Sequence, residues 1–279
     1  MFTKKLFPLF VIIVSVVLLS CATTGPGGKQ SFIIIPSDQE VSIGQGMAQQ
    51  VEETEKLLAD PVWQSYINEV GQKIVAVCDR KDITYQFKVI ESDHINAFAA
   101  PGGFIYFYTG LLREMDNEAE MAAVMAHEIS HVVGRHSVKR LQTMLGVATA
   151  YQLVFGEEGA SEVLNVAINV GMSLLFADYS RDDEREADDY GIHYMVKAGY
   201  DPNGSIGMFE KLAALGGGGE YTVFERLAST HPETNERISN ARAQIAGMRP
   251  MPAGLSLGTQ RYQQMLQRLP AKASGNTGG

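Results

Sequence analysis

The five residues His127-Glu128-Ile129-Ser130-His131 constrain the fold of this chain more than any other stretch of its sequence. Residues four apart lie on one face of an α-helix, so both imidazoles can reach one ion, and Glu128 projects beside that face. This HExxH pattern is typical of zinc peptidases, in which the histidines bind the metal and the glutamate takes a proton from water. The apolar residues 122–126 favour the helix. The alternative is an ordinary helix, although burying these three side chains without partners is costly.

A catalytic zinc takes three protein ligands and leaves one position for water, so a third ligand must come from elsewhere in the chain. The best candidates lie in the acidic stretch 180–188, where Glu184 and Asp188 are four residues apart on one helix face. One carboxylate can bind the metal while the other accepts a hydrogen bond from a histidine ring. The spacing does not choose between them, and an acidic run alone is more often a solvated helix face.

The composition is that of a globular protein. The chain has 279 residues, of which 45% are hydrophobic and 20% charged. A chain of this length buries a large core without cross-links, so a metal site in it is expected to serve chemistry. Acidic residues outnumber basic ones by 32 to 23. That balance argues against nucleic acid as a partner and against electrostatic adhesion to anionic lipid.

Residues 1–20 have the pattern of a secretory signal peptide. Lys4 and Lys5 precede the apolar run 6–19, which is shorter than the roughly 20 residues that span a membrane. The sequence Leu18-Leu19-Ser20-Cys21 resembles a bacterial lipobox, which implies cleavage before Cys21 and lipid attachment to its sulfur. The alternative is an uncleaved membrane helix.

The residues around the lipidated cysteine predict the location. Ala22 stands where an aspartate would be the usual signal for the inner membrane, so we expect the periplasmic face of the outer membrane. Such a lipid anchor holds a protein stably at a bilayer surface. Cys78 is the only other cysteine, so with Cys21 lipidated no intrachain disulfide can form.

The apolar pattern along the chain predicts an α+β fold that is mainly helical. Strands are expected over residues 85–89 and 104–108, with a turn at 100–103 between them. Helices are expected over residues 37–58, with a capping box at Ser37, and over 61–78, 117–134, 181–198 and 233–247, with another starting at 202. The very apolar stretch 138–177 predicts two helices, which we expect to form a mobile flap over the cleft. Residues 22–32 predict a flexible tether.

Four segments together make the chain resemble metallopeptidase family forty-eight, which holds the HtpX heat-shock, CAAX prenyl, mitochondrial Oma and periplasmic BepA and LoiP proteases. They are residues 96–103, residues 117–136 around HExxH, residues 180–188, and residues 230–238 beginning Thr230-His231-Pro232. The resemblance covers roughly residues 37–247 and implies a zincin-like (gluzincin) fold with a small β-sheet. It also implies one Zn²⁺ per chain, with Glu184 as the third ligand and Asp188 as its neighbouring hydrogen-bonding partner.

The resemblance assigns roles to three further places. His231 should lie near the zinc, where it either stabilises the oxyanion or occupies the water's position in a latent form; alone it would be read as a surface or helix-capping residue. His136 fits the family pattern and is expected to be structural. The run Phe104-Ile105-Tyr106-Phe107-Tyr108 should be the edge strand that pairs with an extended substrate, although the sequence alone fits a core strand equally well.

The resulting plan divides the chain into four parts: a signal peptide at 1–20, the lipidated cysteine and tether at 21–36, a zinc metallopeptidase domain at 37–250, and a partly disordered extension at 251–279. Family members such as BepA carry a helical repeat domain after the protease. The residues after Ala246 are too few for repeats of ~34 residues. The compact lipoprotein type of the family is therefore expected.

The leading hypothesis is a lipid-anchored zinc endopeptidase that degrades unfolded or misassembled envelope proteins. The quality-control part rests only on the family. The second hypothesis is a chaperone or assembly factor whose metal site is structural or is kept latent by His231. An intact Glu128 argues against it, because a structural site needs no base. A third is a zinc amidase acting on cell-wall peptides.

Overall fold

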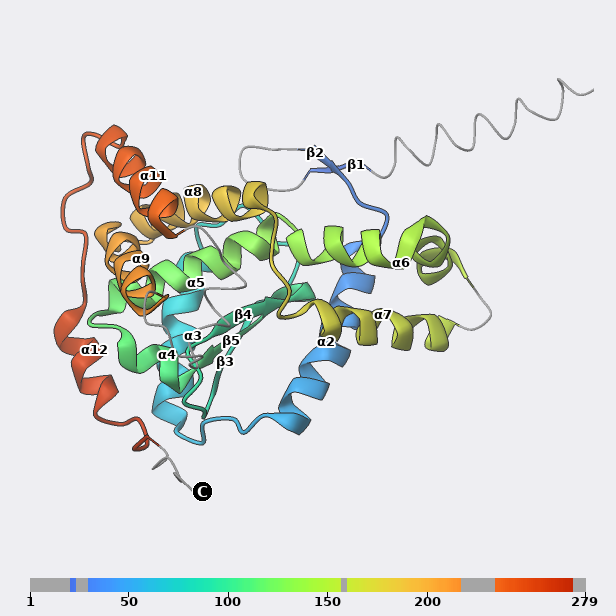
Figure 1. The fold of residues 1–279 in the computed structure, drawn as a ribbon, viewed down its shortest axis with the longest axis horizontal. Helices are drawn as coiled ribbons and strands as arrows, with labels where there is room; N and C mark the ends of the chain where they lie inside the picture. The colour runs from blue at the N-terminus through green and yellow to red at the C-terminus, as the bar shows by residue number, and fades with distance from the viewer. Residues whose placement is uncertain (1–20, 24–29, 157–159, 217–233, 273–279) are drawn as a thin grey trace, which may run out of the picture.

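The computed structural model describes residues 21–23, 30–156, 160–216 and 234–272. Helices surround one three-stranded sheet (Figure 1), so the predicted mainly helical α+β fold is confirmed. Two apolar cores lie on the two faces of this sheet. The predicted signal peptide and His231 lie outside the described residues.

The sheet consists of β3 (Gln86–Ile90), β4 (Ala97–Ala100) and β5 (Phe104–Tyr108), in the order β3-β5-β4. Strand β5 runs parallel to β3 and antiparallel to β4. Its side chains alternate between the two cores: Ile105 and Phe107 enter one, while Phe104, Tyr106 and Tyr108 enter the other. The aromatic run therefore forms a strand because both of its faces are buried.

The prediction that residues 104–108 form an edge strand is wrong. Strand β5 is paired along both sides, and an extended substrate could not reach its backbone. An aromatic, β-branched run cannot distinguish a central strand from an edge strand, because both favour these residue types. Strand β4 lies within the family segment 96–103, and in the described part of the chain it pairs with β5 alone.

Helix α2 (Ser37–Thr54) starts where predicted but without the predicted capping box. The N-cap residue is Pro36, and Glu40 does not turn back to the helix end. Instead its carboxylate accepts hydrogen bonds from the guanidinium groups of Arg80 and Arg135. The helix also ends four residues earlier than predicted, because the chain becomes extended at Glu55 and then runs beside β3.

Helix α3 (Pro61–Val75) follows with Pro61 at its first position, as predicted. The Asp60 carboxylate accepts hydrogen bonds from the backbone amides of Val62 and Trp63 and so caps the helix. After the sheet, the short α4 (Thr109–Glu114) leads into α5 (Glu118–Val133), which contains the HExxH residues. The Asn117 side chain caps α5 by accepting a hydrogen bond from the Glu120 amide.

Two helices occupy the apolar stretch 138–177, as predicted: α6 (His136–Phe155) and α7 (Ala160–Leu174). They lie side by side and extend away from α9 and α11 (Figure 1). The backbone of α6 is non-helical at Gly146, where φ is +73°. The proposed motion of this helix pair as a flap stays a prediction.

Helices α8 (Arg181–Lys197) and α9 (Asn203–Gly216) pack against α5, and α11 (Thr234–Gly247) packs against both of them, all close to their predicted bounds. The Ser180 hydroxyl caps α8 by accepting a hydrogen bond from the Asp183 amide. Across the described ranges, no helix combines the length and the apolar character that a membrane span requires.

Both ends of the folded region extend beyond the predicted domain limits of 37 and 250. Ile33 and Ile35 are buried beneath α2, and β1 (Cys21–Thr23) pairs with β2 (Gln30–Phe32) within the stretch expected to be a flexible tether. Helix α12 (Thr259–Leu266), which the sequence did not predict, returns to the core. An isolated eight-residue helix is stable only through its tertiary contacts, so its own sequence gave no clear signal.

Tyr262 anchors α12. Its side chain is fully buried, packs edge-on against Trp63 and donates a hydrogen bond of 2.7 Å to the Leu112 carbonyl. The Trp63 indole in turn donates to the Met265 carbonyl at 2.9 Å. The described part of the extension therefore closes the core between α3 and α5.

We predict that Tyr262→Ala lowers the free energy of unfolding by about 3–5 kcal/mol, because it leaves a cavity where an aromatic ring was buried. Tyr262→Phe loses only the hydrogen bond and should cost about 1 kcal/mol. Urea unfolding followed by circular dichroism measures both. Equal stabilities for the two variants would mean that α12 contributes little to the core.

Candidate metal centre

The HExxH residues lie in the second half of α5, which is buried along its whole length. Helix α8 packs closely against this half. At Gly191 of α8, an added Cβ would lie 3.3 Å from the backbone nitrogen of His127, so a glycine there lets the two helices approach. This contact places the acidic start of α8 beside the two histidines.

Three of the predicted ligands converge. The Nε2 atoms of His127 and His131 are 2.9 Å apart. The carboxylate of Glu184 places one oxygen 3.6 Å from His127 Nε2 and the other 3.3 Å from His131 Nε2. All three side chains are buried. Among the described residues, these three are the side chains whose donor atoms lie close enough together to hold one metal ion.

This donor set fits zinc. Two imidazole nitrogens and one carboxylate oxygen are a common ligand set of catalytic zinc, and donors at ~2.0–2.1 Å from a tetrahedral ion lie about 3.3 Å apart. The separations between 2.9 and 3.6 Å bracket that value. Burial holds the pKa of His131 well below its ordinary value, which keeps the imidazole neutral, as a ligand must be.

Asp188 lies one helical turn after Glu184 and contacts the other side of His127. Its carboxylate is 2.8 Å from His127 Nδ1. Burial acts to raise the pKa of Asp188, but the Arg237 guanidinium and the hydrogen bond with His127 outweigh it and lower the pKa. The ionised carboxylate favours a proton on Nδ1 and leaves the Nε2 lone pair facing Glu184. The structure thus separates the two acidic residues that the spacing alone could not distinguish.

Arg237 of α11 completes this arrangement, and sequence reasoning gave it no role. Its guanidinium donates two hydrogen bonds of 2.7 Å to Asp188 and lies 3.6 Å from a Glu184 oxygen. Burial opposes its charge, but these carboxylates raise its pKa. It also lies over the ring of Phe209, with 4.4 Å to the ring centroid. Its only sequence signal was its position six residues after His231 in the family segment.

His136 and Tyr179 both contact His131, the second histidine of the HExxH motif. The Nδ1 atoms of His131 and His136 are 2.8 Å apart, and His136 Nε2 lies 3.4 Å from both Asp183 and Glu186. If His131 presents Nε2 to a metal, its Nδ1 donates to His136, whose Nε2 proton then faces the two acids. The Tyr179 ring, which the sequence did not single out, stacks on His131 at 3.9 Å.

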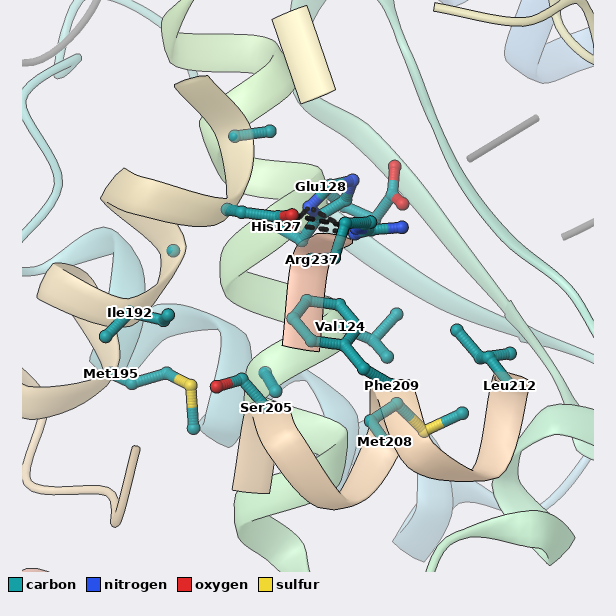
Figure 2. A pocket seen from close by; sticks show the side chains of 14 residues that line it. Val124, His127, Glu128, Ile192, Met195, Ser205, Met208, Phe209, Leu212 and Arg237 are labelled. Carbon is teal, nitrogen blue, oxygen red and sulfur yellow. Dashed lines mark hydrogen bonds and ion pairs between the residues drawn. The ribbon is translucent and has the colours of Figure 1, made fainter. Parts of the chain in front are cut away.

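Glu128, the predicted base, is also buried. Figure 2 shows it beside His127 and Arg237 at one end of a pocket whose other walls are apolar. Strand β4 and the turn after it pack against the same helix. The predicted base and ligands therefore share one site, while the two proposed positions of His231 cannot be compared with the structure.

Comparisons with known proteins agree with this arrangement. The family model described as "Peptidase family M48" matches residues 61–245. The chain is 30% identical over 238 residues to a "Beta-barrel assembly-enhancing protease" of Yersinia pestis, an alignment that covers 82% of this chain and 48% of that protein. It is 34% identical over 175 residues to the "Mitochondrial metalloendopeptidase OMA1" of Schizosaccharomyces pombe, covering 62% and 50%.

A third relative is the "Metalloprotease YcaL" of Escherichia coli strain K12, which is 32% identical over 162 residues. That alignment covers 57% of this chain and 62% of the relative. The chain spans about half the length of the curated beta-barrel assembly-enhancing proteases and OMA1 that it matches. Similarity therefore extends over the helices and the sheet that build the metal centre.

We predict that Asp188→Asn weakens zinc binding by about 10- to 100-fold, because the amide no longer orients His127 or balances Arg237. Competition with a chelating dye measures the affinity. Asp182→Asn, an exposed carboxylate in the first turn of α8 that pairs with Arg185, is the matched control. An unchanged affinity in Asp188→Asn would remove Asp188 from the metal site.

Proposed function

Because the chain belongs to peptidase family M48, a family of metalloproteases with a zincin-like fold, we propose that it is a zinc-dependent endopeptidase of the bacterial cell envelope. One observation carries the proposal. His127, His131 and Glu184 bring three donor atoms within 4.8 Å of one another, with Glu128 next to them on the same helix. These residues would hold one zinc ion per chain.

A bound zinc supplies a Lewis acid that acidifies water and polarises the carbonyl of the bond to be cut. Glu128 takes the proton from the attacking water and passes it to the amine that leaves. Asp188, supported by Arg237, keeps the His127 ring in the required tautomer, and His136 does the same for His131. The rigid burial of these groups keeps the donors aligned without rearrangement during the reaction.

We assign substrate pairing to the side of β4 that has no strand partner among the described residues; the four residues of β4 are buried, so an extended substrate would pair there once this edge is uncovered. It takes the role first assigned to β5, because β4 is paired on one side only within the described residues and packs against α5. Main-chain pairing along such an edge binds polypeptides with little sequence preference. This supports polypeptide rather than cell-wall peptide as the substrate.

The proposed biological role is the removal of unfolded or misassembled envelope proteins. Two kinds of support exist: relatives are named as proteases that enhance β-barrel assembly, and the edge of β4 suits unfolded chains. The chaperone alternative does not require the buried Glu128 beside the metal ligands. For His231, the proposal remains a position near the zinc, either as an oxyanion donor or as a latency ligand, and it rests on the family resemblance.

We predict that Glu128→Gln reduces cleavage of an unfolded protein by about 10²- to 10⁴-fold, because the amide cannot accept the proton. Its zinc content should stay at one ion per chain, since Glu128 is not a ligand. Both are measured on the purified mature domain. Digestion of reduced casein gives the cleavage rate, and metal analysis gives the zinc content. Glu53→Gln, an exposed substitution on α2, is the matched control.

Equal cleavage rates for wild type and Glu128→Gln would end the endopeptidase proposal. In the same assay, His231→Ala distinguishes the two proposed roles of that residue. A faster variant indicates that His231 keeps the enzyme latent, and a much slower one indicates that it stabilises the oxyanion.

We also propose that a lipid on Cys21 holds the mature protein at the outer membrane, as the lipobox-like sequence suggests. We predict that Cys21→Ser moves the protein from the membrane fraction, because an anchor of several acyl chains is lost. Metabolic labelling with palmitate, followed by separation of inner and outer membranes, tests this. Cys78→Ser is the control, since Cys78 is buried in the fold. Equal labelling of wild type and Cys21→Ser would contradict the proposal.

A further inference from the structure

The ring of Tyr179 lies face to face with one of the two histidines of the metal centre. Its centroid is 3.9 Å from the centroid of His131, and the two ring planes are 20° apart. Tyr179 comes from the connection between α7 and α8, two residues before the first residue of α8. A residue outside the HExxH motif therefore covers one face of a metal-binding imidazole.

The other rings around His131 meet it at steep angles. His127 lies at a centroid distance of 4.6 Å with 77° between the planes, and His136 lies at 5.0 Å with 79°. The contact between the Nδ1 atoms of His131 and His136 restrains one atom of the ring. A ring held at one atom can still tilt about it, whereas a ring stacked on a flat neighbour loses contact area when it tilts. Tyr179 thus restrains the motion that the hydrogen bond leaves free.

The two histidines are held by different means. His127 contacts the carboxylate of Asp188, which is ionised and paired with Arg237. The Nδ1 partner of His131 is an imidazole, and hydrogen bonds to a neutral acceptor are weaker than those to a carboxylate. The orientation of His131 therefore depends more on a contact with its face than that of His127 does.

Tyr179 is itself fixed by the start of α6. Its hydroxyl lies 2.8 Å from Ser137 Oγ. The guanidinium of Arg140 lies over the same ring, 4.6 Å from its centroid. Because the His131 imidazole already occupies one face of the phenol ring, Arg140 must lie over the other. The ring of Tyr179 is thus held between a metal ligand and a cation, which is attracted to its electron-rich face.

Arg140 cannot easily leave this position, because it also holds the end of α7. It donates hydrogen bonds to the carbonyls of Leu174 at 2.8 Å and Ala177 at 2.9 Å. A planar guanidinium with two such bonds has a fixed orientation. In Figure 1 the connection from α7 runs past the start of α6 on its way to α8. Ser137 and Arg140, three residues apart on α6, therefore hold Tyr179 from one helix face.

We propose that Tyr179 is a positioning residue of the zinc centre, which fixes the plane of the His131 ring so that Nε2 faces the Nε2 of His127 and the carboxylate of Glu184. The inference rests on the proposed zinc endopeptidase function, in which His131 is a ligand. Tyr179 acts through the flat face of its ring. The role therefore requires an aromatic side chain and does not require the hydroxyl.

The rate of zinc release tests this role. In the mature protein loaded with zinc, Tyr179→Leu should release the metal about three- to tenfold faster, which is the range that one aromatic stack supplies. Tyr179→Phe keeps the stack and should release zinc at the wild-type rate. Transfer of zinc to an excess of a chelating dye measures the rate. Tyr151→Leu, which removes an exposed tyrosine of α6, is the matched control. Equal rates for Tyr179→Leu and Tyr179→Phe would overturn the proposal.

A spectroscopic measurement distinguishes positioning from a general loss of stability. With Co²⁺ in place of zinc, the visible absorption bands depend on the arrangement of the ligands. Tyr179→Leu should change the position or shape of these bands, whereas Tyr179→Phe should retain the wild-type bands. Wild-type bands in a Tyr179→Leu protein that merely unfolds at a lower temperature would show a structural role alone and contradict the proposal.

A double-mutant cycle tests whether Arg140 acts through Tyr179. Arg140→Ala removes the support behind the phenol ring and should also speed zinc release. In the Tyr179→Leu background the same substitution should add nothing, because two residues that act through one contact are not additive. Fully additive effects would contradict the proposed link. If wild type binds no zinc, the proposed function and this inference both fail. Tight zinc binding without any cleavage would overturn the endopeptidase function alone.

Discussion

The packing of α8 against α5 is the contact on which the site depends. Gly191 permits the close approach of the two helices. This approach brings Glu184 to the Nε2 atoms of both histidines and Asp188 to Nδ1 of His127. Burying carboxylates and a guanidinium is unfavourable unless each is paired. Here Arg237 of α11 pairs with both acids of α8, so the charged groups compensate one another and fix α11 against α8.

A second buried network fixes the C-terminal end of α5. Glu40 of α2 accepts hydrogen bonds from Arg80, Arg135 and the Gly102 amide, and Arg80 also donates to the Val132 carbonyl. Arg135 adopts a left-handed backbone conformation with φ of +52°, which is unfavourable for a residue with a side chain. Its ion pair with Glu40 at 2.8 Å compensates this cost and turns the chain sharply into α6. Both networks therefore hold the second half of the HExxH helix, and His136 enters the site directly after the turn.

Short-range spacing along the chain was enough to predict the HExxH helix, the helix that carries Glu184 and Asp188, and the position of the strand 104–108. Helical periodicity and strand propensity act over a few residues, so a single sequence contains them in full. The edge strand was assigned wrongly, and Arg237, Tyr179 and α12 were missed. Each of these features depends on a contact between residues far apart in sequence. The sheet places β5 between β3 and β4, Tyr179 stacks on His131, and α12 returns to Trp63. These contacts emerge only when the whole chain is folded, because their energy comes from burial between elements rather than from the local chain.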